Sequence, residues 1–418
     1  MPGKEVIEME IQVRRLRETL ALLEPAVPKK ASLPVCRYVR LGDGRAIATD
    51  LDVGVSIDLA GAEEPILLPL KGALDFLRFT PGHQAALIAV SDNKATITVG
   101  DMQTILESAD PQDFPALPMD GGESDGVLNG DALVRALVSV APYATSETGR
   151  PTLNGVHLAT GDELEAVAAD GYRLVWERIP GRLPGPPMVI PTRAVDLLAP
   201  LWKHAAAPAV GEAQDVAGLA MAKRLIRLDW GTERLRLRFG AVCMAIKLIQ
   251  GTFPNYRQLI PSETTSSLTV FGEDLERAVR QVAGMAQKGS GIVRLSWEGE
   301  RLLVSAKAED VGETSVPVAA QCASPGRTAL NLGYLRGYLK GKAGFITISL
   351  SGESGPVLFA HRGTPHVVMM PMGVQWDGPT PAAVSEAEEG VEQAEAHAEV
   401  AQDASEEEPK RKRKRKEG

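Results

Sequence analysis

The sequence has few cysteines, no long hydrophobic run and no excess of positive charge, and each absence excludes a class of protein. Its three cysteines (Cys36, Cys243 and Cys322) are odd in number and far apart, so they favour a reduced cytosolic interior over a disulfide framework. No stretch approaches the roughly 20 apolar residues of a membrane-spanning helix. Met1–Arg15 also lacks the apolar core of a secretory signal. We therefore expect a soluble, cytoplasmic protein with no membrane partner.

Metal and nucleotide motifs are missing as well. No histidine stands at metal-ligand spacing with a cysteine or another histidine in a credible helical motif, so no metal site is predicted. The six histidines are His83, His157, His204, His361, His366 and His397. No glycine-rich loop is followed by Lys-Ser/Thr, which excludes the usual phosphate cradle. We expect no enzymatic activity, no catalytic residue and no cofactor.

The net charge of −9 argues against a protein that holds nucleic acid by bulk attraction. The charge is unevenly distributed. The last 44 residues carry 12 Asp/Glu and 7 Lys/Arg, so this tail has a charge of −5 and the remaining body −4. A chain of 418 residues is also too long for one hydrophobic core and predicts two to four domains.

A repeat occupies most of the chain. Three amphipathic helices are predicted from apolar residues at i, i+4 and i+7, a spacing that puts them on one helix face. The triplets are Leu16, Leu20 and Leu23; Leu133, Leu137 and Val140; and Leu275, Val279 and Val282. A second predicted helix follows each: Leu70, Leu74 and Leu77 after Pro69; Val195, Leu198 and Trp202 after Pro191; and Leu332, Leu335 and Leu339 after Asn331.

The offsets between the copies are nearly constant. They are 117 residues from Leu16 to Leu133 and 142 from Leu133 to Leu275, and the second helices give 122 and 140. Constant offsets indicate a three-fold duplication. The predicted domains are 1–122, 123–262 and 263–375, followed by a tail at 376–418. We place about 20 extra residues of the middle copy in a surface loop at about 204–219, which is rich in Ala, Gly and Pro.

Between the helices lie short runs in which apolar and polar residues alternate, as in half-buried strands. Examples are Ala46–Leu59, Ala86–Val99, Arg224–Leu237 and Arg301–Ala306. Two helices among such strands in each copy predict an α+β fold. It would consist of three repeated domains, each with two helices packed on antiparallel sheet.

One segment carries a recognisable motif. Residues 150–157 read Arg-Pro-Thr-Leu-Asn-Gly-Val-His, a Gly-Asp turn follows, and residues 167–174 read Val-Ala-Ala-Asp-Gly-Tyr-Arg-Leu. This pattern predicts a β-meander whose third strand is entered through Asp-Gly. An Arg-x-x-Leu-Asn-Gly strand before an Ala-Thr-Asp-Gly-His-Arg-Leu turn resembles the bacterial replicative sliding clamp family, the beta subunit of DNA polymerase III. Here Ala169 replaces Thr and Tyr172 replaces His.

Three more segments match that family in order. Phe-Pro-Asn-Tyr-Arg at 253–257 resembles its Phe-Pro-Asp-Tyr-Arg, Asn331 and Tyr334 match its Asn-x-x-Tyr, and residues 368–372 resemble its Val-Met-Pro-Met. The resemblance implies the DNA-clamp fold and a head-to-tail dimeric ring. Such a ring encircles duplex DNA and tethers the replicative polymerase and other replication or repair proteins. The alternative is a clamp-like paralogue that binds partner peptides but contacts DNA through its basic tail.

Arginines on the first helices fit a ring around DNA. At 100° per residue they fall opposite the apolar stripes; they are Arg14, Arg135, Arg277 and Arg280. A solvated face explains any one of them, whereas three copies favour a basic lining. Lys29 and Lys30 stand where the family has a basic loop near DNA, although a plain solvated turn explains them equally well. Because topology holds a closed ring on DNA, weak, sequence-independent phosphate contacts suffice.

The family binds partner proteins in a groove between its second and third domains. By resemblance the groove residues here are Leu153, Gly171, Tyr172, Arg173, Leu174, Pro254, Gln258, Leu259, Asn331, Tyr334, Val368, Met370, Pro371 and Met372. Methionines suit varied apolar side chains, and Arg173 and Asn331 can orient a backbone or a glutamine. Family partners present a peptide like Gln-Leu-x-Leu-Phe. Core packing is the alternative reading of the methionines and prolines.

Three further expectations follow from the resemblance. In the family the first domain of one chain meets the third domain of the other. Ile105, Leu106 and Met285 are the candidates for that dimer interface, with core packing an equal alternative. ATP would be used by a separate clamp loader, and the protein would be cytoplasmic, at the nucleoid. The tail, acidic over 379–408 and basic over 410–416, is predicted to be disordered. It would act as an electrostatic tether to DNA or merely as a solubilising extension.

Overall fold

The computed structural model describes residues 7–117, 122–147, 149–205, 224–352, 354–362 and 365–376. The predicted inserted loop lies outside the described residues except for His204 and Ala205, which end a helix. The predicted tail lies outside them except for Trp376. The chain forms two compact units that divide between Asn255 and Tyr256. We refer to them as unit 1 and unit 2.

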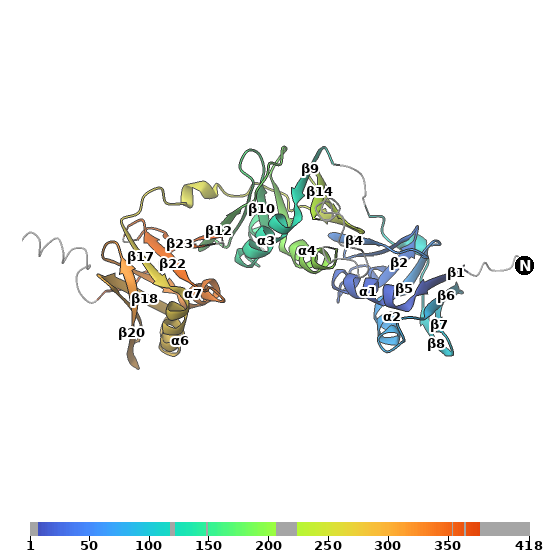
Figure 1. The fold of residues 1–418 in the computed structure, drawn as a ribbon, viewed down its shortest axis with the longest axis horizontal. Coiled ribbons are helices and arrows are strands. Elements are labelled where there is room, and N and C mark those ends of the chain that lie inside the picture. The colour runs from blue at the N-terminus through green and yellow to red at the C-terminus, as the bar shows by residue number, and fades with distance from the viewer. Residues whose placement is uncertain are drawn as a thin grey trace, which may run out of the picture. The chain divides into compact units, whose positions relative to one another are not determined.

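Unit 1 contains two successive sets of strands and helices (Figure 1). The first set is β1 (Ile7–Gln12), α1 (Val13–Leu23), β2 (Tyr38–Gly42), β3 (Arg45–Thr49), β4 (Val53–Asp58), β5 (Ile66–Pro69), α2 (Leu70–Leu77), β6 (Ala85–Ser91), β7 (Lys94–Val99) and β8 (Met102–Glu107). The second is β9 (Ser124–Asn129), α3 (Gly130–Val140), β10 (Gly155–Ala159), β11 (Glu165–Ala169), β12 (Arg173–Arg178), β13 (Met188–Pro191), α4 (Thr192–Ala205), β14 (Leu225–Trp230), β15 (Arg234–Phe239) and β16 (Val242–Lys247).

Unit 2 contains a third set. It comprises β17 (Ser266–Phe271), α6 (Gly272–Lys288), β18 (Ile292–Glu298), β19 (Arg301–Ala308), β20 (Gly312–Cys322), β21 (Gly326–Asn331), α7 (Leu332–Leu339), β22 (Phe345–Leu350), β23 (Val357–His361) and β24 (His366–Met369). In all three sets the first helix directly follows one strand (β1, β9 or β17) and the second follows another (β5, β13 or β21). The predicted helices are therefore confirmed, whereas the division into three domains at 122/123 and 262/263 stays a prediction.

The sheets are antiparallel, as the sequence predicts. In unit 1 the strand orders are β1-β6-β7-β8, β5-β2-β3-β4-β16-β15-β14-β9 and β13-β10-β11-β12, and in unit 2 the order is β24-β23-β22-β17-β20-β19-β18-β21. Strand β4 pairs with β16, with Val53 opposite Ile246, which makes the first two sets of unit 1 share one sheet. The predicted meander is β10-β11-β12, with His157 opposite Val167 and Val167 opposite Trp176.

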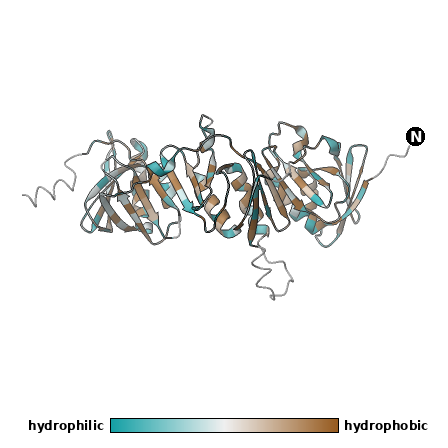
Figure 2. Ribbon diagram, turned by 90° about the horizontal axis from the view of Figure 1, so that it is seen from above, coloured by the Kyte–Doolittle hydropathy of each residue, from teal (hydrophilic) through white to brown (hydrophobic). Residues whose placement is uncertain are grey.

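Helices and sheets bury the apolar residues that defined the pattern. The α1 stripe Leu16, Leu20 and Leu23 is fully buried. Helix α1 packs on α2, α3 on α4 and α6 on α7 (Figure 1). Hydrophobic and hydrophilic residues are interleaved along the strands (Figure 2), as in β7, where Ala95 and Ile97 are buried and Lys94 is exposed. Each pleated sheet thus turns one face to the helices and the other to solvent.

Two details differ from the sequence prediction. Three of the four predicted strand runs are hairpins rather than single strands; in one, Asp92 and Asn93 both have positive φ, at 53° and 58°. Two such residues make the tight turn that matches the twist of paired strands. The motif strand also begins at Gly155, because Pro151–Leu153 forms a short 3₁₀ helix (η5) instead. Proline lacks the N–H that a ladder needs, so it favours that 3₁₀ start.

Candidate functional site

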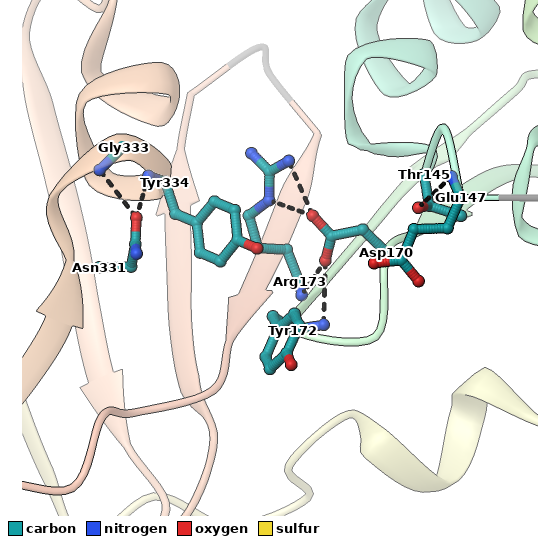
Figure 3. A network of polar contacts seen from close by, with 8 residues as sticks. All are labelled: Thr145, Glu147, Asp170, Tyr172, Arg173, Asn331, Gly333 and Tyr334. Carbon is teal, nitrogen blue, oxygen red and sulfur yellow. Dashed lines mark hydrogen bonds and ion pairs between the residues drawn. The ribbon is translucent and has the colours of Figure 1, made fainter. Parts of the chain in front are cut away.

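The turn between β11 and β12 is organised by the carboxylate of Asp170. Its Oδ1 accepts hydrogen bonds from the backbone N–H groups of Tyr172 and Arg173, at 2.9 and 2.8 Å. Its Oδ2 accepts a third from Arg173 Nε at 2.9 Å (Figure 3). Gly171, at φ 93°, occupies a conformation that a side chain would strain. The Asp-Gly pair recognised in the sequence thus fixes the position of the Arg173 side chain.

The guanidinium of Arg173 is mostly buried. Its side chain is 14% exposed and that of its ion-pair partner Asp170 is 11% exposed. The Cζ atom also lies 4.9 Å from the centre of the Tyr143 ring, a cation–π distance. Burial raises the pKa of Tyr143 and outweighs the opposite effect of the Arg173 charge. Arg173 is therefore held from two sides and is suited to present donors in a fixed direction.

The other predicted groove residues of unit 1 differ in their exposure. Tyr172 is 58% exposed, whereas Leu174 on β12 and Leu153 on η5 are buried. Pro254, near the end of unit 1, is exposed. In this unit the structure thus provides an exposed aromatic, a fixed cation and buried leucines that would serve as a floor rather than a rim.

A buried imidazole lies on the neighbouring strand β10. His157 stacks on Phe253, with ring centres 4.6 Å apart and an angle of 8° between the planes. Burial lowers the pKa of His157 to about 4, so the ring is neutral near pH 7. His157 is therefore a packing residue that orders Phe253, the start of the Phe-Pro-Asn-Tyr-Arg motif.

In unit 2, Asn331 caps helix α7. Its Oδ1 accepts hydrogen bonds from the backbone N–H groups of Gly333 and Tyr334, at 2.8 and 3.2 Å (Figure 3). An asparagine cap fixes both the helix start and its own side chain, which accounts for the Asn-x-x-Tyr spacing. Gln258 and Leu259 lie on the 3₁₀ helix η6 (Tyr256–Leu259) and are exposed, Leu259 by 50%.

The last strand, β24, leads into the methionine segment. Val368 is 2% exposed, whereas Met370 is 41% exposed. Pro371 and Met372 are half-buried, and the backbone N–H of Met372 donates to the carbonyl of Ala329 on β21 at 2.8 Å. Met370 is thus the exposed member of the predicted methionine pair. The structure groups the predicted groove residues within each unit, and their joint groove stays a prediction.

The helix arginines lie where the periodicity placed them, on exposed faces, with side chains 63–68% exposed. Each also has an acidic neighbour, which the sequence analysis did not anticipate. The pairs are Arg14–Glu18 at 3.0 Å, Arg135–Glu177 at 3.3 Å, Arg280–Glu276 at 2.6 Å, and Arg277–Asp274. Lys29 and Lys30 are exposed. The faces are therefore lined with ion pairs rather than with bare positive charge.

The three interface candidates differ in exposure. Ile105 is 61% exposed on β8, the edge strand of its sheet. Leu106 is half-buried against α2, where a Cβ on Gly72 would lie 2.8 Å from one of its methyl groups. Met285 on α6 is half-buried. Ile105 is thus a surface residue, and Leu106 combines a packing contact with partial exposure.

Sequence reasoning missed Tyr143, which lies under Arg173, and Trp376, which stacks on two arginines. No local signal announces either contact, because each joins segments far apart in the chain. Within the described residues, His, Cys, Asp and Glu side chains form no cluster of three that could hold a metal ion. No described helix has the length and apolar character needed to cross a membrane.

The chain is similar to curated proteins along nearly their whole length. It is 27% identical over 378 residues to the beta sliding clamp of Synechococcus elongatus, covering 86% of this chain and 97% of that protein. It is 24% identical over 386 residues to the beta sliding clamp of Caulobacter vibrioides, covering 88% and 96%. No protein-family model matches the chain.

Solved structures share the fold. The DNA polymerase III subunit beta from Pseudomonas aeruginosa superposes with a TM-score of 0.77 at 21% identity, covering 88% of this chain and all of that one. The beta sliding clamp of C. crescentus gives a TM-score of 0.78 at 23% identity, with the same coverage of both chains. At these identities the likeness establishes a common fold.

Proposed function

We infer that this chain is a bacterial sliding clamp, a member of the DNA polymerase III beta subunit family that keeps the polymerase on duplex DNA. This inference rests on sequence similarity that extends over 97% of the S. elongatus protein. The same pattern of helices and strands, repeated three times along the chain, supports it. A local match would fit any protein that borrowed one domain. A match along the whole length of a non-modular ring protein favours the same assembly.

We propose that two chains close the ring through strand edges. Strand β8 is an edge in unit 1. In unit 2, β20 pairs with β19 over Gly312–Ala319 and with β17 only over Ala320–Cys322. Two such edges can continue one sheet between copies, and a heterologous contact of this kind closes if the rotation returns to the start. Ile105, Leu106 and Met285 are the proposed interface side chains.

We propose that the first helices face the DNA. Exposed ion pairs are each worth about 0–1 kcal/mol, so a phosphate can displace Glu18 from Arg14 or Asp274 from Arg277 at little cost. The side chains of Arg135 and Arg280 are 63% and 68% exposed, so a phosphate can approach them although their partners Glu177 and Glu276 are mostly buried. Contacts of this type are weak and independent of sequence, which suits sliding. Lys29 and Lys30 are proposed to contribute in the same way.

We propose that partner proteins dock through a short peptide in the predicted groove. Arg173 and the Asn331 cap are fixed polar groups, and Met370 and Leu259 are exposed apolar ones. A peptide like Gln-Leu-x-Leu-Phe needs both kinds of contact. The P. aeruginosa clamp has been solved bound to griselimycin, and we propose that the present chain likewise accepts ligands of this size. The partners would include the polymerase and an ATP-dependent loader, at the nucleoid in the cytoplasm, with no catalysis by the clamp itself.

Negative-stain imaging of the purified protein without DNA, with its solution mass, tests the ring. The expected result is closed particles with a central hole and twice the 44.5 kDa mass of the chain. Single chains at micromolar concentration would overturn a self-closing clamp and favour the paralogue that contacts DNA through its basic tail.

A further inference from the structure

The methionine segment is held at a second point beyond the family-like motif. After β24 ends at Met369, the chain passes Met370 and Pro371, and the Met372 N–H bonds to Ala329 on β21. Strand β21 is the last strand of the unit 2 sheet, so this hydrogen bond caps an edge. The segment then continues to Trp376.

Trp376 lies against two cations of that same edge. The guanidinium carbons of Arg294 on β18 and Arg327 on β21 are 5.5 and 5.1 Å from its ring centre. Arg294 is opposite Ala329, and Arg327 is opposite Ser296, so both arginines project from one face of the sheet. The residues that alternate with Arg294, Val293 and Leu295, are buried on the face that packs against α6. Trp376 therefore covers the sheet face that points away from the helix.

We propose that Trp376 is a positioning residue for the partner-peptide groove. Through its stacking on Arg294 and Arg327, it keeps the Met372 N–H on Ala329 and so holds Met370 in the orientation that receives an apolar side chain. This inference rests on the proposed peptide-binding function and adds a determinant outside the groove itself.

The physical case is one of weak contacts acting together. An edge hydrogen bond is open to competition from water, and each cation–π contact at a half-exposed site is also modest. Gly373 stands between the two anchors, and a Cβ built there meets nothing within 4 Å. Glycine keeps more backbone freedom than other residues. Without the indole, the segment after Pro371 loses both cation–π contacts and keeps the Met372 hydrogen bond, which a glycine follows directly.

The test uses the full chain and the variant Trp376→Ala. Two quantities are measured: binding of a fluorescein-labelled peptide with the sequence Gln-Leu-Ser-Leu-Phe, and hydrogen exchange of the Met372 amide. We expect the peptide affinity to fall about three- to tenfold, as for loss of two weak contacts. Exchange at Met372 is expected to accelerate by a similar factor, with the melting temperature nearly unchanged.

Three control variants separate positioning from general structure. Trp376→Phe keeps a ring over both arginines and is expected to restore most of the affinity. Gln375→Ala removes an exposed neighbour and is expected to change neither measurement. Gly373→Ala restricts the backbone at an open site and is expected to slow exchange at Met372.

The outcomes are distinguishable. If the wild-type chain binds no peptide, the proposed function fails, and the exchange rate alone decides whether Trp376 anchors the segment. If the wild type binds and Trp376→Ala binds equally well with unchanged exchange, the positioning role is wrong while the proposed function stands. Faster exchange with unchanged affinity would also overturn the role, since the anchor would then not act on the groove.

Discussion

The β3–β4 and β11–β12 turns of unit 1 have the same backbone design and different surroundings. In each, an aspartate Oδ1 accepts two backbone N–H groups: those of Asp52 and Val53 for Asp50, and those of Tyr172 and Arg173 for Asp170. The second turn pairs its Oδ2 with an arginine three residues along, whereas Asp50 pairs at 3.2 Å with Arg193 on α4.

Because of this difference, the β3–β4 turn has a structural role and the β11–β12 turn is part of the candidate site. Arg193 also donates to the carbonyl of Pro25, which lies in the short 3₁₀ helix Glu24–Ala26 after α1. The arginine that pairs with the first turn thus connects α4 to the end of α1. The second turn keeps its arginine within its own hairpin, beside exposed Tyr172. A duplicated turn can therefore supply rigidity in one copy and a preorganised cation in another, because only the partner residue changes.

The largest expected difference between the first and second copies is in how their stability depends on pH. His157 on β10 lies opposite the residue two positions before Pro191, and Arg40 on β2 lies opposite the residue two positions before Pro69. The two residues are therefore at equivalent positions of the two copies, but Arg40 forms an ion pair with Asp43. The pKa of His157 is lowered to about 4, so its contribution to stability is full above pH 6.5 and is lost as the pH falls toward 4. The loss is at most about 3 kcal/mol, because the unfolded chain binds the proton first.

Chemical denaturation of the wild type and His157→Phe from pH 8 to 4 measures this effect. The variant keeps a ring on Phe253 and does not titrate, so its stability should fall less than that of the wild type below pH 6.5. Parallel curves would show that His157 does not carry the pH dependence.

Replacing the aspartate of each turn by alanine should lower the stability more in the β11–β12 turn than in the β3–β4 turn. We expect Asp170→Ala to cost about 2 kcal/mol, because it takes the carboxylate away from a mostly buried guanidinium and from two N–H groups. Asp50→Ala should cost about 1 kcal/mol, since Arg193 is 44% exposed and solvent screens its loss. Urea unfolding of both variants gives the two values, and only Asp170→Ala should also abolish peptide binding. Equal peptide affinities in the two variants would contradict the assignment of Arg173.

Exchanging the residue after the aspartate should lower the stability in one turn and raise it in the other. Gly171 has φ 93° and Leu51 has φ 81°, a region that costs a residue with a side chain roughly 1 kcal/mol or more. Gly171→Ala should destabilise by about 1 kcal/mol. Leu51→Gly should stabilise by only a few tenths, because the relief of this strain is partly offset by the larger entropy that glycine loses on folding. Thermal denaturation with a reversibility check measures both, and a destabilised Leu51→Gly would mean that the half-exposed leucine contributes packing.

The smallest expected effect concerns the helix arginines. Arg277→Gln with Arg280→Gln in unit 2 and Arg14→Gln in unit 1 should each change stability by no more than about 0.5 kcal/mol per pair. The retention of loaded protein on circular DNA should nonetheless fall, and its dependence on salt concentration should be shallower in the double variant than in the single one, because each lost phosphate contact lowers the number of counterions released. Identical salt profiles for the two variants and the wild type would remove these arginines from the DNA-facing set.

Local chemistry explains which predictions the structure confirmed. The apolar spacing predicted α1, α3 and α6 because a helix repeats every 3.6 residues, and Asp170-Gly171 predicted the meander because its φ and hydrogen bonds are set within four residues. The hairpin in Ala86–Val99 was missed because Asp92-Asn93 was not read as a turn. The acidic partners of Arg277 and Arg280 were also within reach of sequence, three and four residues away.

The sequence by itself determined the repeated helix and strand pattern, the turn at Asp170 and the order of the family motifs, because these depend on neighbours along the chain. Only the tertiary structure decided that Arg193 serves Asp50, that Tyr143 lies under Arg173, and that Trp376 covers Arg294 and Arg327. The physical reason is that these contacts join residues that are 30 to 143 positions apart in the sequence and are brought together only by folding. Their partners are chosen by sheet register and helix packing, which no local pattern encodes.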